Sequence, residues 1–146
     1  MYATTDDLTR ALGNFADCYR VDSADSGLGT LDSGLMSDDL AAASAEVDGY
    51  LCARYSVPVV AGGALALLKS WTLAIATELA FGRADGAEAP AKFTERAKTV
   101  RASLTEVAKG NIPLPAAPAE TTDKGGSVAL LSVAEPEFTR QKMGGF

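Results

Sequence analysis

The side chains of this chain that could do acid–base or metal chemistry are mostly aspartates within its first fifty residues. Asp6 with Asp7 and Asp38 with Asp39 are the first candidates for a catalytic dyad. A dyad needs carboxylates that face each other across a site, whereas adjacent carboxylates suit the first turn of a helix, where the helix dipole favours negative charge. Both pairs follow a Thr or Ser that can cap a helix. We therefore interpret them as helix-capping residues and predict no catalytic residue.

A second acidic feature lies in the segment between Asp17 and Met36, which is rich in Asp, Ser and Gly and reads as a long loop. Its run Asp22-Ser23-Ala24-Asp25-Ser26-Gly27, with Asp32 beyond it, has the carboxylates and the turn glycine that calcium coordination uses. The spacing differs from that of an EF-hand, and no bidentate Glu follows. We predict no metal site.

The composition of the whole chain also argues against catalysis. Its 146 residues include no histidine, the commonest general acid–base and metal ligand. No nucleophile elbow, phosphate loop or dinucleotide fingerprint is present in the sequence. The two cysteines, Cys18 and Cys52, fit no ligand spacing and are expected to be buried, reduced thiols that are not bonded to each other. We predict a protein that is not an enzyme and has no cofactor.

Hydrophobic periodicity predicts a mainly α fold with a four-helix body. The helices are expected near residues 5–12, 37–55, 63–82 and 90–109. Gly13 and Gly110 mark helix ends, Pro90 is a suitable helix start, and Gly49 inside the second helix predicts the close approach of a neighbouring helix. The predicted core consists of Val47, Leu51, Leu68, Trp71, Ile75, Leu79, Val100 and Leu104.

Two features of the third and fourth predicted helices leave alternatives to weigh. Lys69 and Glu78 interrupt the apolar stretch 62–82 on opposite faces, so we interpret it as the central core helix and not as a membrane span. In the last helix, the basic side chains lie away from the apolar seam. They form either a solvated face or a subunit contact opposite the acidic N-terminal half. These side chains are Lys92, Arg96, Lys98 and Arg101.

The last third of the chain differs in character from the helical part. We predict a helical body over residues 1–111, a Pro/Gly-rich linker over 112–126 and an extended C-terminal assembly arm over 127–146. Within the arm, 127–133 and 138–142 have strand chemistry, but they are too short to form a stable isolated hairpin. We expect another chain to order them by strand addition. The predicted assembly interface comprises the anchors Val128, Leu130, Phe138 and Phe146 and the polar rim Arg140 and Lys142.

Two segments give the chain its most specific resemblance to a known family. The first is Glu46-Val47-Asp48-Gly49-Tyr50-Leu51, continued by Ala53-Arg54-Tyr55 and Val57-Pro58, and the second is the ending Phe138-Thr139-Arg140 to Gly145-Phe146. With the order of the predicted helices, they resemble the small head-gene proteins of Mu-like phages and prophages, which look like neck proteins. The acidic loop departs from the Asp-rich, ion-binding pattern of many relatives, so no metal role is carried over.

The resemblance implies a structural head–tail connector, an adaptor or head-completion subunit without chemistry of its own. It implies self-association into a ring of about twelve subunits, docked on the portal protein and receiving a tail-side neck or tail terminator protein. Such a protein is assembled in the host cytoplasm and is found at the neck of the virion. Packaged DNA would pass through the ring without specific binding, and the acidic excess, a formal charge of −6, suits such a channel.

Two other classes of protein remain as alternatives. A small helical DNA-binding regulatory protein needs a basic recognition helix, but residues 37–55 carry Asp38, Asp39, Glu46 and Asp48 against Arg54 alone. An enzyme or metal-dependent hydrolase would need a bound divalent ion. Imaging or native mass measurement with and without the portal would separate a ring component from a monomeric regulator.

Overall fold

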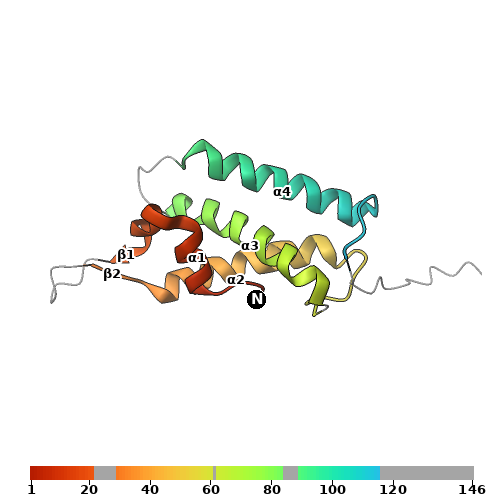
Figure 1. Cartoon of the computed structure of the whole chain (residues 1–146), viewed down its shortest axis with the longest axis horizontal. Helices are drawn as coiled ribbons and strands as arrows, with labels where there is room; N and C mark the ends of the chain where they lie inside the picture. The colour runs from red at the N-terminus through yellow and green to blue at the C-terminus, as the bar shows by residue number, and fades with distance from the viewer. Residues whose placement is uncertain (22–28, 61, 84–88, 116–146) are drawn as a thin grey trace, which may run out of the picture.

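The computed structural model describes residues 1–21, 29–60, 62–83 and 89–115. Within these residues it places four α-helices, α1 (Thr5–Leu12), α2 (Ser33–Leu51), α3 (Gly62–Arg83) and α4 (Ala91–Lys109). A 3₁₀ helix, η1 (Gly13–Tyr19), follows α1. Two short antiparallel strands, β1 (Arg20–Val21) and β2 (Thr30–Leu31), come next. The predicted mainly α class is confirmed (Figure 1).

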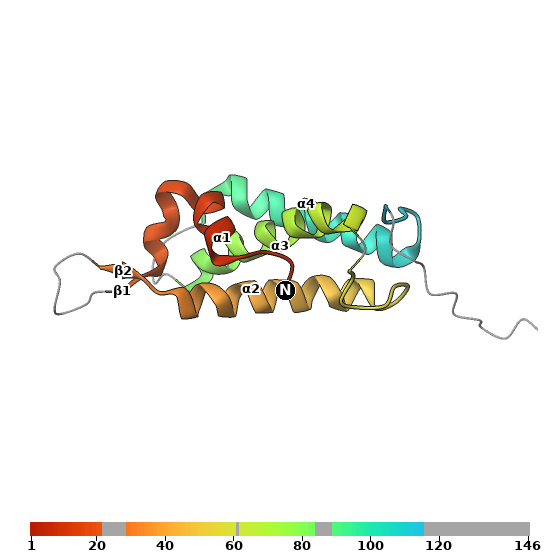
Figure 2. The same ribbon diagram turned by 60° about the horizontal axis from the view of Figure 1, so that its bottom comes forward.

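The three long helices run side by side along the length of the body, with α3 between α2 and α4 (Figure 1). The short helix α1 packs against both α2 and α3, and η1 continues from it towards the β1–β2 pair at one end (Figure 2). The connection from α2 to α3 and the end of α4 lie at the opposite end of the body (Figure 1). This arrangement makes α3 the central helix.

Helix α1 has the bounds that its sequence predicts. Thr4 is the N-cap, and its side chain and that of Asp7 form a reciprocal capping box. Gly13 ends the helix with a φ of 58°, a conformation that side-chain-bearing residues rarely adopt. The interpretation of Asp6 and Asp7 as residues of a helix first turn is confirmed.

Helix α2 begins four residues before the predicted start at Ser37 and ends at Leu51 instead of Tyr55. Asp32 is its N-cap, because the Asp32 carboxylate accepts hydrogen bonds from the backbone N–H of Gly34 (2.8 Å) and Leu35 (3.1 Å). The capping interpretation of Asp38 with Asp39 is therefore wrong, since this pair lies in the second turn. The predicted loop is also shorter than expected, because η1, the β1–β2 pair and the first turn of α2 occupy much of residues 17–36.

The core lies where the helices meet around α3. Six of the eight predicted core residues are buried: Val47, Leu51, Leu68, Ile75, Val100 and Leu104. Trp71 and Leu79 are only partly buried at the margin, so their prediction as core residues is wrong. Fully buried alanines such as Ala76 and Ala80 fill the helix contacts of α3, because small side chains let packed helices approach each other.

Helix α3 is long and apolar enough to cross a membrane by length and composition, but 56% of its most apolar window is buried inside the body. It also packs against α1, α2 and α4. The prediction of a central core helix is confirmed.

Two predictions about single residues are wrong, one about Gly49 and one about the burial of the two cysteines. A Cβ added at Gly49 would meet no atom within 4 Å, so no helix approaches there. Val47 and Leu51 turn to the core, which leaves Gly49 on the outer face of α2. Cys18 and Cys52 are free, as expected, but Cys52 is exposed and Cys18 is half-buried. Cys52 is exposed because it caps the end of α2 beyond its last buried residue.

Candidate functional site

The predicted assembly interface, Val128, Leu130, Phe138, Arg140, Lys142 and Phe146, lies outside the described residues, as do the predicted strand segments 127–133 and 138–142. The structure does show how the body leads to that region. Leu114 is buried, and its backbone N–H donates a hydrogen bond to the Tyr55 hydroxyl at 3.1 Å. The contacts of the body thus extend to Leu114, inside the range predicted as linker.

Asp39 is the most buried carboxylate in the described part of the chain, with a side chain 5% exposed. The Tyr19 hydroxyl donates a hydrogen bond to its Oδ2 at 2.6 Å, and Arg83 Nη2 reaches its Oδ1 at 2.5 Å. Burial, with the hydrogen bond to Asp39, raises the pKa of the Tyr19 phenol above its usual range. The hydrogen bond to Asp39 likewise raises the pKa of the Arg83 guanidinium. This cluster ties η1, α2 and α3 together.

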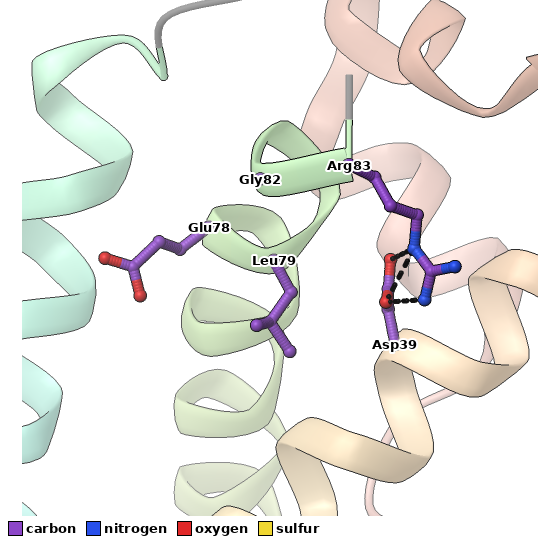
Figure 3. A pocket seen from close by; sticks show the side chains of 5 residues that line it. All are labelled: Asp39, Glu78, Leu79, Gly82 and Arg83. Atoms are coloured by element: carbon purple, nitrogen blue, oxygen red, sulfur yellow. Dashed lines mark hydrogen bonds and ion pairs between the residues drawn. The ribbon is translucent and has the colours of Figure 1, made fainter. Parts of the chain in front are cut away.

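A hollow of 440 Å³ lies beside this cluster and is lined by Asp39, Glu78, Leu79, Gly82 and Arg83. Figure 3 shows that Arg83 closes on Asp39 while Glu78 points away from both, towards α4. Both carboxylate oxygens of Asp39 are already hydrogen-bonded. The Asp39 carboxylate is therefore held by side chains from η1 and α3, beside the hollow.

Arg101 forms a second cluster that joins α4 to the other two long helices. Its Nε donates to Glu46 Oε1 at 2.6 Å, and its Nη1 donates to Glu78 Oε2 at 2.5 Å. The hydrogen bond to Glu46 is the main cause that raises the Arg101 pKa above its usual range. For Arg101, the solvated-face alternative is wrong, because the side chain is half-buried and paired. Its partners are in its own chain, because helix packing brings Glu46 and Glu78 to it.

The other predicted basic side chains of α4 are exposed. Lys98 pairs with Glu95 on the same helix at 3.0 Å, and the Arg96 guanidinium lies 3.4 Å from Ser70 Oγ. The Lys92 ammonium stands 4.6 Å from the centre of the Phe93 ring and 5.1 Å from that of Phe15. These three side chains lie on the surface of the body, and for them both the solvated face and the subunit contact stay predictions.

Sequence reasoning missed a set of contacts at the end where the chain leaves the body. The Tyr2 hydroxyl donates to Asp48 and accepts a hydrogen bond from the Val59 N–H at 3.0 Å. Burial, with the hydrogen bond to Asp48, raises the pKa of Tyr2 to about 12. Arg54 Nη1 donates to the Lys109 carbonyl oxygen at 3.4 Å. Asp48, Arg54 and Tyr55 belong to the segment that carries the family resemblance. That resemblance was the sequence signal that could have pointed to these contacts.

The same end exposes aliphatic side chains from three segments. Val57 (37% exposed) and Val60 (84%) follow α2, Leu65 (38%) is in the first turn of α3, and Ile112 (46%) follows α4. We call these four residues the apolar end. The contacts from Arg54 to Lys109 and from Leu114 to Tyr55 hold two of these segments together.

Among residues 1–21, 29–60, 62–83 and 89–115, no group of three or more Asp, Glu or Cys side chains could hold a metal ion. Of the acidic loop, Asp32 is described and caps α2, whereas Asp22 and Asp25 lie outside the described residues.

Comparison with known proteins places the chain in a family. Residues 2–131 match the family described as Bacteriophage Mu, Gp36. No curated protein matches the chain. The family match covers the helical body and the segment Glu46–Pro58, but it stops before the ending from Phe138 to Phe146. Because the match spans most of the chain, the protein belongs to the Bacteriophage Mu, Gp36 family and is a phage structural or morphogenesis protein.

Proposed function

We propose that this protein is a head–tail connector subunit, a neck or adaptor protein that forms a ring between the portal and the tail of a tailed phage. The family match carries the proposal, since it runs through the whole body and into the predicted arm. The subunit is assembled in the host cytoplasm and ends in the neck of the virion, where the ring surrounds the DNA channel.

The polar clusters of the body support a role without catalysis. Asp39 is engaged by Tyr19 and Arg83. Arg101 is engaged by Glu46 and Glu78. In both clusters the charges join helices to each other, which stiffens a scaffold. We therefore propose a structural subunit that is not an enzyme.

The arm supplies the contacts to partners in this proposal. An extended segment docks on a partner through backbone hydrogen bonds, while its apolar side chains fill pockets on the partner surface. Val128, Leu130, Phe138 and Phe146 are the proposed anchors, and the partners are a neighbouring copy, the portal and a tail-side neck or terminator protein.

The charge of the chain favours a channel over DNA capture. A protein with a formal charge of −6 repels phosphates unless it clusters its cations. Helix α2, the predicted candidate for a recognition helix, has neither Lys nor Arg between Ser33 and Leu51. The alternative of a DNA-binding regulator therefore has less support than the connector.

Complementation of a phage that lacks this gene tests the proposal. We expect the mutant to accumulate DNA-filled heads without tails, and the full chain to restore infectious particles. The chain lacking residues 127–146 should keep the helical body, by circular dichroism and thermal melting, but should fail to join heads to tails. Negative-stain imaging of the purified chain with its portal should show a ring. Wild-type particle yield from the truncated chain would contradict the role of the arm, and normal tail joining without the gene would contradict the connector.

A further inference from the structure

The apolar end, formed by Val57, Val60, Leu65 and Ile112, is concentrated on one part of the body. Seven large apolar side chains are exposed in the described residues, and these four come from segments that meet at a single end. Scattered exposed apolar residues are ordinary, but a gathered set marks a surface that binds something. Val60, at 84% exposed, has almost no cover from the residues that the structure describes.

This end is held in a fixed arrangement by hydrogen bonds. Tyr2 binds the Val59 N–H, Tyr55 binds the Leu114 N–H, and Arg54 binds the Lys109 carbonyl oxygen. These contacts join the N-terminus, the α2–α3 connection and the segment after α4. A surface that is ordered before binding loses little conformational entropy when a partner docks.

The chain itself carries a segment of matching chemistry beyond the described residues. Leu114 is buried at this end, and the 31 residues 116–146 follow. Residues 127–133 include Val128, Ala129, Leu130, Leu131 and Val133, an apolar run of the kind that pockets between aliphatic side chains accept. No charged residue interrupts that run.

The length of the spacer favours a neighbouring copy as the source of this segment. The eleven residues 116–126 can span at most about 36–40 Å when extended. Helix α4, with 19 residues, is about 28 Å long, so the spacer can reach past the length of a neighbouring body. Pro113, Pro115 and Pro118 stiffen the start of this path, which disfavours a return to the surface that the chain has just left.

We propose that the apolar end of each subunit receives residues 127–133 of a neighbouring copy. This inference rests on the proposed connector function. It adds to that function the surface that receives the arm and the direction of the contact between neighbouring copies. The arm and the apolar end are different surfaces of one chain, so the contact is heterologous and runs head to tail. Repeated contacts of this kind close into a ring when the rotation allows it.

Two full-length variants and their mixture test the contact. Val60→Asp damages the receiving surface and keeps the arm, whereas Leu130→Asp damages the arm and keeps the receiving surface. Val60 is exposed, so its replacement should leave the melting temperature unchanged. Each variant alone should self-associate at least about tenfold more weakly than the wild type, because a charge replaces a buried aliphatic group. Native mass measurement and sedimentation give the readout.

The mixture separates a neighbour's arm from a subunit's own arm. The arm of the Val60→Asp chain can enter the intact end of the Leu130→Asp chain, but no further contact can follow, so we expect a one-to-one heterodimer. Ala91→Asp, at the exposed first residue of α4 and at the opposite end of the body, is the control and should assemble like the wild type. Wild-type assembly by Val60→Asp, or a mixture that remains monomeric, would overturn the inference and leave the connector standing. A wild-type chain that stays monomeric with and without the portal would overturn both.

Discussion

Arg54 lies directly against Gly110, so that a Cβ added at Gly110 would stand 1.8 Å from the Arg54 Nη1 atom. Gly110 ends α4 with a φ of 86°. Arg54 comes from the α2–α3 connection, and its Nη1 also reaches the Lys109 carbonyl oxygen. A cation at the C-terminal end of a helix is favourable because the helix dipole is negative there. The missing side chain of Gly110 thus lets two connections that are distant in the sequence close on each other.

Gly110→Ala should destabilise the protein by about 1–3 kcal/mol, because the positive φ becomes strained and Arg54 must move. Urea unfolding measures the change. The matched control is Gly49→Ala, in the interior of α2 with open space around it, which should stabilise by up to about 1 kcal/mol. Equal effects of the two substitutions would contradict the contact between Gly110 and Arg54.

Thr72 is fully buried on α3. Its hydroxyl has no hydrogen-bond partner among the described residues. Thr72→Val replaces that hydroxyl with a methyl group of similar shape, so stability should stay level or rise by about 1 kcal/mol. Thr77→Val is the control, because the buried Thr77 hydroxyl donates to the Ala74 carbonyl oxygen at 2.9 Å. The control should lose up to about 1 kcal/mol. A loss at Thr72 larger than that at Thr77 would refute this assignment.

Alkaline pH should destabilise the fold through Tyr2 and Tyr19. Burial raises the pKa of Tyr2 to about 12 and also raises the pKa of Tyr19. An unfolded tyrosine titrates near pH 10, so the folded state holds these protons more tightly. Their contribution is complete below about pH 10 and is lost as the pH rises through the folded-state values.

Urea midpoints at pH 7, 9 and 11 check this dependence. Tyr2→Phe and Tyr19→Phe should each flatten the alkaline fall in stability, since phenylalanine has no proton to lose. Tyr50→Phe, a partly buried residue of α2, is the control for the loss of a hydroxyl. The explanation fails if the alkaline slope is the same in all three variants and the wild type.

Leu104 is fully buried on α4. Leu104→Ala should cost about 2–5 kcal/mol, from lost burial and the cavity that remains. The same truncation at Leu65, which is 38% exposed, should cost clearly less, and thermal melting compares the two. A cost below about 0.5 kcal/mol at Leu104 would contradict its place in the packing of α4.

Duplex DNA should not bind the isolated chain at physiological salt, because its net charge is negative and Arg101 is occupied by Glu46 and Glu78. Fluorescence polarisation with labelled duplex at about 0.15 M salt is the measurement. Micromolar binding that weakens steeply with added salt would favour the DNA-binding regulator over the connector.

The sequence by itself determined the features that depend on neighbouring residues. The bounds of α1 follow from the Thr4–Asp7 capping box and Gly13, and the end of α4 follows from Gly110, because caps and positive φ angles act within one turn. Most of the core was also predictable, since Val47, Leu51, Leu68 and Leu104 recur at helical spacing. The predicted start of α2 near Ser37 was wrong, because Ser37 with Asp38 and Asp39 has the local chemistry of a helix start, although Asp32 is the N-cap.

Only the tertiary structure decided which side chains pair with the charged residues Asp39 and Arg101. Asp39 appeared to belong to a helix start, but packing places it between Tyr19 and Arg83. Arg101 appeared to lie on a surface, but α2 and α3 bring Glu46 and Glu78 to it. An ion pair between helices depends on how those helices are oriented in space, and no local spacing records that orientation. The apolar end arises in the same way, because three separate segments expose aliphatic side chains at one place only after the helices have packed.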